Sequence, residues 1–361
     1  HGMVRACGGS VWLIRSLPPL LASAHNMCRT SRPPVECCRM KRSTDRILTT
    51  HAGRLLASNS MGQMVGGGGG AANREALIPQ IKTAMREVVE KQVQTGIDVI
   101  SDGEVGKVGG ITYFGPRMSG ITRKKPEGEP SMMSQRTNER LEFAEFYETM
   151  GTFRNMAPER LCATGPLKFV GRAEIESDTE LFKEALQGVK TEEQFMCALA
   201  PGWIEHGLWN EHYTSDEEFL FGIADAMHDE YKAIVDAGFV LQLDDPGLPD
   251  TYDMIVPAPS IEAANPRHEH EWKVWRDVKL PDGKILIPGV VSHASNVVEH
   301  PELVADRIVQ YAELVGKENV IAGTDCGMGG RVHMQIGWAK LKALSEGAQL
   351  ATKQLWGRGP T

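Results

Sequence analysis

The stretch "PELVADRIVQYAELVGKENVIAGTDCG" (residues 301–327) decides the fold class. Its first part, residues 301–316, repeats apolar residues at helical spacing, begins with a proline and ends at a glycine, all of which are typical of a helix. Its second part, residues 319–327, is a short apolar run that ends in a Thr-Asp-Cys-Gly turn, which indicates a buried strand. A helix that leads directly into such a strand is one unit of a parallel α/β protein.

The same alternation of strand and helix continues through most of the chain. Strands are predicted at residues 46–53, 97–104, 161–171, 239–247 and 282–293, and helices at 74–96, 177–189, 215–238 and 336–356. Polar residues occur repeatedly where these strands end: His51, Glu104, Asp244, Glu262, His293 and Cys326. In a (β/α) barrel such strand ends converge on one mouth, where catalytic groups gather. An open doubly wound sheet is the alternative, although no strand is followed by the Gly-x-Gly-x-x-Gly of a dinucleotide site.

Composition excludes several classes of protein. The chain of 361 residues is 41% hydrophobic and 24% charged, which is typical of a globular protein of one large or two medium domains. Its formal net charge of −8 argues against a nucleic-acid partner, because phosphate binding requires a basic surface. No apolar run approaches the ~18 residues that a membrane span requires. Four of the seven cysteines precede residue 40, so the remainder favours a reducing, cytoplasmic environment over a disulfide framework.

Residues 1–39 differ from the rest of the chain. They contain five arginines and a single acidic residue, Glu36, a composition that suits a mitochondrial transit peptide. An expression-tag remnant or an extension upstream of a start at Met40 are the alternatives. We therefore expect residues 1–39 to be a leader, tag or disordered extension outside the core fold, and residues 40–361 to form a single barrel.

Six stretches, taken together and in this order, resemble a known family. They are "ILTTHAG", "GIDVISDGEVGK", "GFVLQLDDP", "IEAANPRHEHEW", "IPGVVSH" and "NVIAGTDCGMGGRVH". Over residues 44–356 the chain resembles the C-terminal barrel of cobalamin-independent methionine synthase, most closely its single-barrel relatives, which include epoxyalkane:coenzyme M transferase. The resemblance implies a (β/α)8 TIM barrel with a zinc ion that binds a thiol substrate. A metal favours the thiolate, which is the nucleophilic form, at neutral pH.

The resemblance also implies roles for individual residues. Cys326 and Glu262 match zinc ligands, and His293 matches a histidine that acts in acid–base chemistry or positions the substrate. Asp244 and Glu104 match carboxylates that hold the amino group of an amino-acid thiol or line its pocket. We expect Cys162 and Cys197 to be structural, as buried free cysteines usually are.

The first strand's loop combines a match with a departure. His51 lies in the loop whose backbone faces the substrate in the family. Arg54 follows Gly53 where the family usually has a serine. An arginine there would suit an anionic substrate group such as a carboxylate or a sulfonate.

A second departure concerns the zinc site and the fold together. The family supplies a His-x-Cys pair from a strand between those of the aspartate and the glutamate, and this chain contains no His-x-Cys. Asp244 and Glu262 are only 18 residues apart, whereas a strand–helix–strand unit needs about 30. We therefore predict that one strand–helix element is missing or irregular there, and that the zinc site lacks two ligands. His268 and His270 could be recruited, although we favour a polar loop against Trp272.

The predicted function is zinc-dependent transfer of a methyl or other alkyl group to a homocysteine-like thiol. The enzyme would be of the 5-methyltetrahydropteroyltriglutamate–homocysteine S-methyltransferase type, with a small thiol and a folate-like alkyl donor as partners. A C–S lyase or a thiol–epoxide transferase on the same fold is the first alternative. A degenerate, non-catalytic barrel is the second, and a uroporphyrinogen-decarboxylase-like activity is a distant third. The identity of the thiol and the donor, and whether the chain forms a homo-oligomer, are left open.

Overall fold

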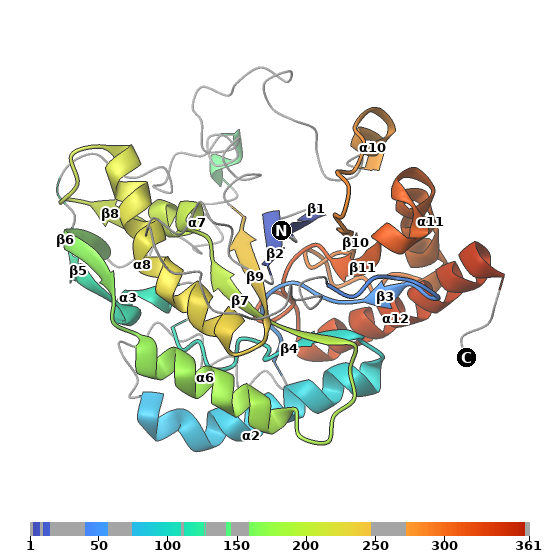
Figure 1. The fold of residues 1–361 in the computed structure, drawn as a ribbon, viewed down its shortest axis with the longest axis horizontal. Coiled ribbons are helices and arrows are strands. Elements are labelled where there is room, and N and C mark those ends of the chain that lie inside the picture. Colours follow the sequence, from blue (N-terminus) through green and yellow to red (C-terminus); the bar gives the residue numbers. More distant parts are fainter. Residues whose placement is uncertain are drawn as a thin grey trace, which may run out of the picture.

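The computed structural model describes residues 3–7, 10–14, 40–56, 74–109, 112–125, 127, 142–145, 159–246 and 272–357, the first two ranges by their backbone alone. Strands and helices alternate through most of this part of the chain (Figure 1). The predicted α/β class with parallel strands is therefore confirmed. None of the described helices combines the length and apolarity that a membrane span requires.

One sheet of eight strands forms the centre of the molecule. Its order is β3 (Leu48–Thr49), β11 (Ile321–Thr324), β10 (Leu286–Val291), β1 (Met3–Cys7), β2 (Ser10–Ile14), β9 (Val240–Asp245), β7 (Glu193–Leu199) and β4 (Val99–Ser101). The two edge strands also meet. The Asp98 amide donates to the Thr49 carbonyl at 3.2 Å, and the Thr50 hydroxyl donates to the Val99 carbonyl at 2.9 Å.

The predicted irregularity after Asp244 corresponds to an insertion in this sheet. β9 and β10 do not pair directly, because the β1–β2 hairpin lies between them (Figure 1). β2 runs antiparallel to β9 and β1 runs parallel to β10. The hairpin thereby pairs backbone groups that would otherwise form two open strand edges. Sequence analysis placed residues 1–39 outside the core fold, yet two stretches of that segment belong to the sheet in the structure.

In the part of the chain that the structure describes, five long helices pack around the sheet. They are α2 (Arg74–Thr95), α6 (Arg172–Ala185), α8 (Asp216–Asp236), α11 (Pro301–Val315) and α12 (Met334–Trp356). Their apolar faces bury core side chains, and Phe182 on α6 stacks on Phe239 with 4.8 Å between ring centroids. α11 and α12 approach closely at Gly347, where a Cβ atom would lie 2.5 Å from Val304 Cγ1. A side chain there would push the two helices apart.

Two predicted elements differ from the structure. The strand expected at 161–171 is β6 (Arg160–Phe169), but it belongs to a separate three-stranded sheet with β5 (Met118–Lys124) and β8 (Leu208–Asn210). α6 begins at Arg172, before the expected start at Ser177 and Asp178, residue types that favour the N-terminus of a helix. Asp178 lies inside that helix because it pairs with buried Arg117 at 2.6 Å, so a tertiary ion pair overrides the local capping preference.

Candidate functional site

Strand ends of the large sheet bring several predicted site residues together. A Cβ atom on Gly53, after β3, would lie 3.8 Å from Glu104 Oε1 after β4 and 3.3 Å from the Cα of Gly327 after β11. Asp244 lies near the end of β9 and His293 follows β10. Glu262, the predicted zinc ligand, is outside the described residues, as are His268 and His270.

Three side chains form the centre of this site. One ligand atom each from Glu104, Cys197 and Asp244 lies within 4.8 Å of the other two. β7 and β9 pair in parallel with Cys197 opposite Gln242 and Leu199 opposite Asp244. Because side chains alternate along a strand, Gln242 and Asp244 point to the same face. The Cys197 thiol donates to Gln242 Oε1 at 2.8 Å, which places the sulfur on that face as well.

Glu104 reaches the cluster from a strained turn. It is the only non-glycine residue with positive φ, at 56°, among those that the structure describes. Its amide donates to Asp102 Oδ1 at 3.1 Å, which supports this conformation. Residues in the left-handed region cost of order 1 kcal/mol or more and are concentrated at functional sites.

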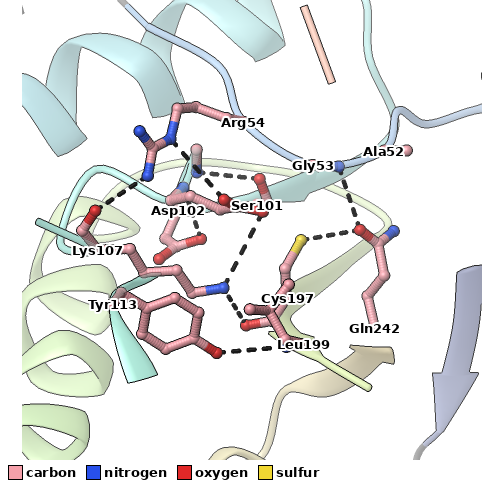
Figure 2. A network of polar contacts seen from close by, with 12 residues as sticks. Ala52, Gly53, Arg54, Ser101, Asp102, Lys107, Tyr113, Cys197, Leu199 and Gln242 are labelled. Carbon is pink, nitrogen blue, oxygen red and sulfur yellow. Dashed lines mark hydrogen bonds and ion pairs between the residues drawn. The ribbon is translucent and has the colours of Figure 1, made fainter. Parts of the chain in front are cut away.

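Two cations border the cluster. Lys107 donates to the Cys197 carbonyl at 2.6 Å and lies over the Tyr113 ring, 4.7 Å from its centroid (Figure 2). Its Nζ is 4.0 Å from Glu104 Oε1. Arg54 donates to the Lys107 carbonyl at 2.9 Å (Figure 2), and its Nε lies 3.8 Å from Glu104 Oε2. The predicted anion-binding arginine is thus engaged within the protein, and its contact with a substrate stays a prediction.

Burial and mutual repulsion shift the pKa values of the three central groups. Burial, together with the charge of Glu104, raises the pKa of Asp244 well above its usual range. Burial, together with the charge of Asp244, raises the pKa of the Cys197 thiol well above its usual value. Burial would also raise the pKa of Glu104, but the positive charges of Lys107 and Arg54 outweigh it, and that pKa is lowered. The negative charge of the cluster is therefore concentrated on Glu104.

His293 is oriented by an aspartate. Its Nδ1 lies 2.8 Å from Asp325 Oδ1, which also accepts the His293 backbone N–H at 2.8 Å. Arg331 Nη1 lies 3.2 Å from the other ring nitrogen, Nε2. These partners assign the proton to Nδ1 and leave Nε2 as the acceptor. Burial would raise the pKa of Asp325, but its hydrogen bonds and its electrostatic interaction with His293 together outweigh burial, and that pKa is lowered.

Two further predicted site residues are not part of the three-residue cluster, although the charges of Glu104 and Asp244 reach them. His51 is buried, with Nε2 2.9 Å from Gln92 Oε1 and its ring tilted against Phe195, so its side chain is held in the core. That the backbone of its loop faces a substrate stays a prediction. Cys326 is a half-buried free thiol whose pKa is raised by burial. With Glu262 undescribed and no His-x-Cys in the sequence, the four-ligand zinc set implied by the resemblance does not assemble from the described residues.

Sequence reasoning missed β7 and Lys107, and it expected Cys197 to be structural rather than part of the site. The signal was the run "QFMCALAP" (residues 194–201), an apolar stretch that ends at a proline. This run has the length and composition of a buried strand. Reading it as a strand would have put Cys197 near a strand end, beside the carboxylates already singled out.

Comparisons with known proteins give relatives of low identity. No family model matches the chain. The methionine synthase of Sulfolobus acidocaldarius is 24% identical over 188 residues, which span 50% of this chain and 45% of that protein. The chain thus matches less than half of this relative's length. The methionine synthase of Thermococcus kodakarensis is 22% identical over 324 residues, which span 78% of this chain and 86% of that protein.

Solved structures show a similar fold. The B12-independent methionine synthase of Shewanella sp. W3-18-1, in complex with selenomethionine, superposes with a TM-score of 0.61 at 19% identity, covering 87% of this chain and all of that one. The putative B12-independent methionine synthase of Listeria monocytogenes gives 0.53 at 17% identity with the same coverage of this chain. These matches confirm the resemblance predicted from the motifs: the chain is similar in sequence and fold to the cobalamin-independent methionine synthases.

Proposed function

We propose that the chain transfers an alkyl group, with methyl as the first candidate, to the sulfur of a small amino-acid thiol. The observation that carries this proposal is the convergence of Glu104 and Asp244, from different strands, on one partly buried point. Two carboxyl groups held so closely suit a cationic partner, because a positive charge between them allows both to be ionised at once. The ammonium group of an amino acid is such a partner. The selenomethionine in the Shewanella structure supports a ligand of this class.

The groups around His293 suit removal of the proton from the substrate thiol. His293, with its proton placed on Nδ1 by Asp325, presents Nε2 as the acceptor for a thiol proton. Arg331, which contacts Nε2 at 3.2 Å, would have to move aside for a substrate to reach it. Binding the thiol and the alkyl donor in line lowers the activation free energy, because two reactants held together react as a single molecule. Zinc, if bound, would favour the thiolate, but the implied ligand set does not fit the described residues, so no step is derived through it.

The proposal includes the barrel architecture of the relatives. The edge strands β3 and β4 meet through hydrogen bonds, which supports closure of the sheet. The β1–β2 hairpin occupies the place where a strand–helix element is expected. In this proposal the closed sheet directs the ends of β4, β7 and β9 to a common mouth, as in other barrels.

An activity assay tests the proposal. The full chain is incubated with L-homocysteine and, separately, with folate-type methyl donors and methylcobalamin, and methionine is measured by mass spectrometry. We expect methionine to form, and its formation to be lost in Glu104→Gln and Asp244→Asn. Asp282→Asn, at a carboxyl that is 96% exposed, is the matched control and should retain activity. Formation of a thioether from coenzyme M and an epoxide instead would favour the thiol–epoxide alternative, and no product from either pair would contradict the proposal.

A further inference from the structure

We propose that Arg331 recognises the carboxylate of the amino-acid thiol, and that this contact releases His293 Nε2 to accept the thiol proton. The inference rests on the proposed function, in which Glu104 and Asp244 bind the ammonium group of the same molecule. An amino acid carries its carboxylate on the same carbon atom as its ammonium group. A guanidinium group suits a carboxylate, because it can donate two parallel hydrogen bonds to it.

Arg331, His293 and Asp325 form a row of three interacting side chains. Asp325 Oδ1 lies 2.8 Å from His293 Nδ1, and Arg331 Nη1 lies 3.2 Å from His293 Nε2. Since an arginine has only donors, this contact occupies the acceptor that a thiol proton would need. A guanidinium group binds an ionised carboxylate more strongly than a neutral imidazole. A substrate carboxylate therefore draws Arg331 away from His293.

The loop that carries Arg331 is anchored through its backbone. The Gly329 N–H donates to the Arg54 carbonyl at 2.8 Å. The Arg331 N–H donates to the carbonyl of Met328 at 3.3 Å, and the Met328 side chain is buried. The side chain of Arg331, in contrast, is exposed. The change of partner therefore needs rotation of one side chain and no movement of the loop.

The charge of Arg331 is available to an anion. Arg54 and Lys107, the other two cations near these strand ends, already face Glu104 at 3.8 Å and 4.0 Å. Arg331 forms no ion pair with any carboxylate of the described residues, and its contact with His293 is to a neutral ring nitrogen. An incoming carboxylate thus has no internal competitor there.

The loop of Arg331 passes beside the ammonium site. A Cβ atom on Gly53 would lie 3.3 Å from the Cα of Gly327, where the loop begins, and 3.8 Å from Glu104 Oε1. The loop and the Glu104 carboxylate therefore lie within contact distance of the same backbone position.

The Cys326 thiol responds to groups from both ends of this site. Burial raises its pKa, the positive charge of Arg331 opposes that shift, and the charge of Asp244 adds to it. Arg331 and Asp244 are thus within electrostatic reach of one side chain. A bound amino acid has its ammonium group toward Asp244 and its carboxylate toward Arg331.

Ligand binding to the full chain tests the inference without depending on turnover. Isothermal titration calorimetry compares L-methionine with L-methioninol, which keeps the ammonium group and the thioether but has an alcohol in place of the carboxylate. We expect L-methionine to bind at least about tenfold more tightly, the factor that one charge-assisted hydrogen bond contributes. Arg331→Gln should lose this preference with unchanged affinity for L-methioninol, and Arg331→Lys should keep part of it. Arg172→Gln, at a surface arginine paired with Glu176, is the matched control and should keep all of it.

Nuclear magnetic resonance tests the release of His293. The resonance of His293 Nε2, assigned with His293→Gln, should shift when L-methionine binds, because the nitrogen loses its Arg331 donor. L-Methioninol should not cause this shift. Equal shifts with both ligands would overturn the release step.

Other outcomes overturn the recognition step. A preference for L-methionine that survives in Arg331→Gln would place carboxylate recognition elsewhere, and a folded chain that binds neither ligand would contradict this inference. Circular dichroism checks the fold of each variant. A preference that depends on Arg331 without methyl transfer would leave this inference standing while the proposed function fails. Methyl transfer with a preference independent of Arg331 would do the reverse.

Discussion

The Cys197 sulfur and Gln242 Oε1 lie 2.8 Å apart across the paired strands β7 and β9. The same oxygen accepts the Gly53 N–H, so one buried amide connects three strand ends of the site. Gln242→Leu has about the same volume but leaves the thiol and the Gly53 amide without this acceptor. We expect it to lower the free energy of unfolding by about 1–3 kcal/mol, the cost of an unsatisfied buried donor. Urea unfolding measures this, and an unchanged midpoint would contradict the role given to Gln242.

Arg117 connects the small sheet to the helices through a buried network. It pairs with Asp178 at 2.6 Å and with Glu230 at 3.2 Å, and its side chain is 2% exposed. Arg117→Met removes the buried cation from both carboxylates, and the remaining contacts of Asp178 with Arg74 and of Glu230 with the Tyr113 hydroxyl do not replace it. We expect this to cost about 3–5 kcal/mol.

Arg172, which pairs with Glu176 at the surface, is the matched control, and Arg172→Met should cost at most about 1 kcal/mol. Urea unfolding measures both changes. Similar losses of unfolding free energy in the two variants would contradict a stabilising role for the buried ion pairs of Arg117.

His51 predicts a pH dependence of stability. Burial lowers its pKa from the ordinary 6.5, despite the hydrogen bond to Gln92. Below pH 6.5 the unfolded chain therefore takes up a proton that the folded chain does not, and stability is lost as the pH falls, by at most about 1.4 kcal/mol per pH unit. His51→Gln should flatten the dependence of the unfolding free energy between pH 7 and pH 5. His228→Gln, at a partly exposed position on α8, should not, and equal slopes in all three proteins would contradict this assignment.

The β1–β2 hairpin makes a prediction about assembly. A chain that begins at Met40 lacks both strands, and β9 and β10 then expose unpaired edges. Exposed edges promote pairing with other chains, so we expect a lower melting temperature and concentration-dependent self-association. Light scattering with size-exclusion chromatography measures the association. An unchanged melting temperature and an unchanged size at all concentrations would show that the hairpin does not complete the sheet.

The sequence predicts the elements whose patterns are local. α11 and α12 lie within two residues of the expected ranges, and β11 lies inside the expected range 319–327, because their apolar spacing and end signals are strong. The ends of β4, β9 and β10 were found because a polar residue follows each apolar run. Which strands pair with each other could not be predicted from such local patterns. The sequence of β6 resembles that of any buried strand. Only its pairing with β5, which is distant in the sequence, shows that it belongs to the small sheet.

The centre of the site depends on the same non-local information. Asp244 and Glu104 were expected from their motifs, but Cys197 enters only through the register of β7 against β9. The position of α6 depends on Arg117, which is 61 residues from Asp178 in the sequence. Residues 1–39 have a basic, acid-poor composition that favours a leader, yet β1 and β2 pair with β10 and β9 at the place where the spacing predicted an irregularity.

Methionine formation from L-homocysteine and an isotopically labelled methyl donor tests the central claim most directly. The account predicts labelled methionine from the full chain. It also predicts a loss of at least about 100-fold in Asp244→Asn, because removing a preorganised charged contact costs of order 3 kcal/mol. Asp282→Asn should match the unaltered chain. Absence of labelled methionine with every donor, in a folded protein, would contradict the claim that the strand-end cluster binds an amino-acid thiol for alkyl transfer.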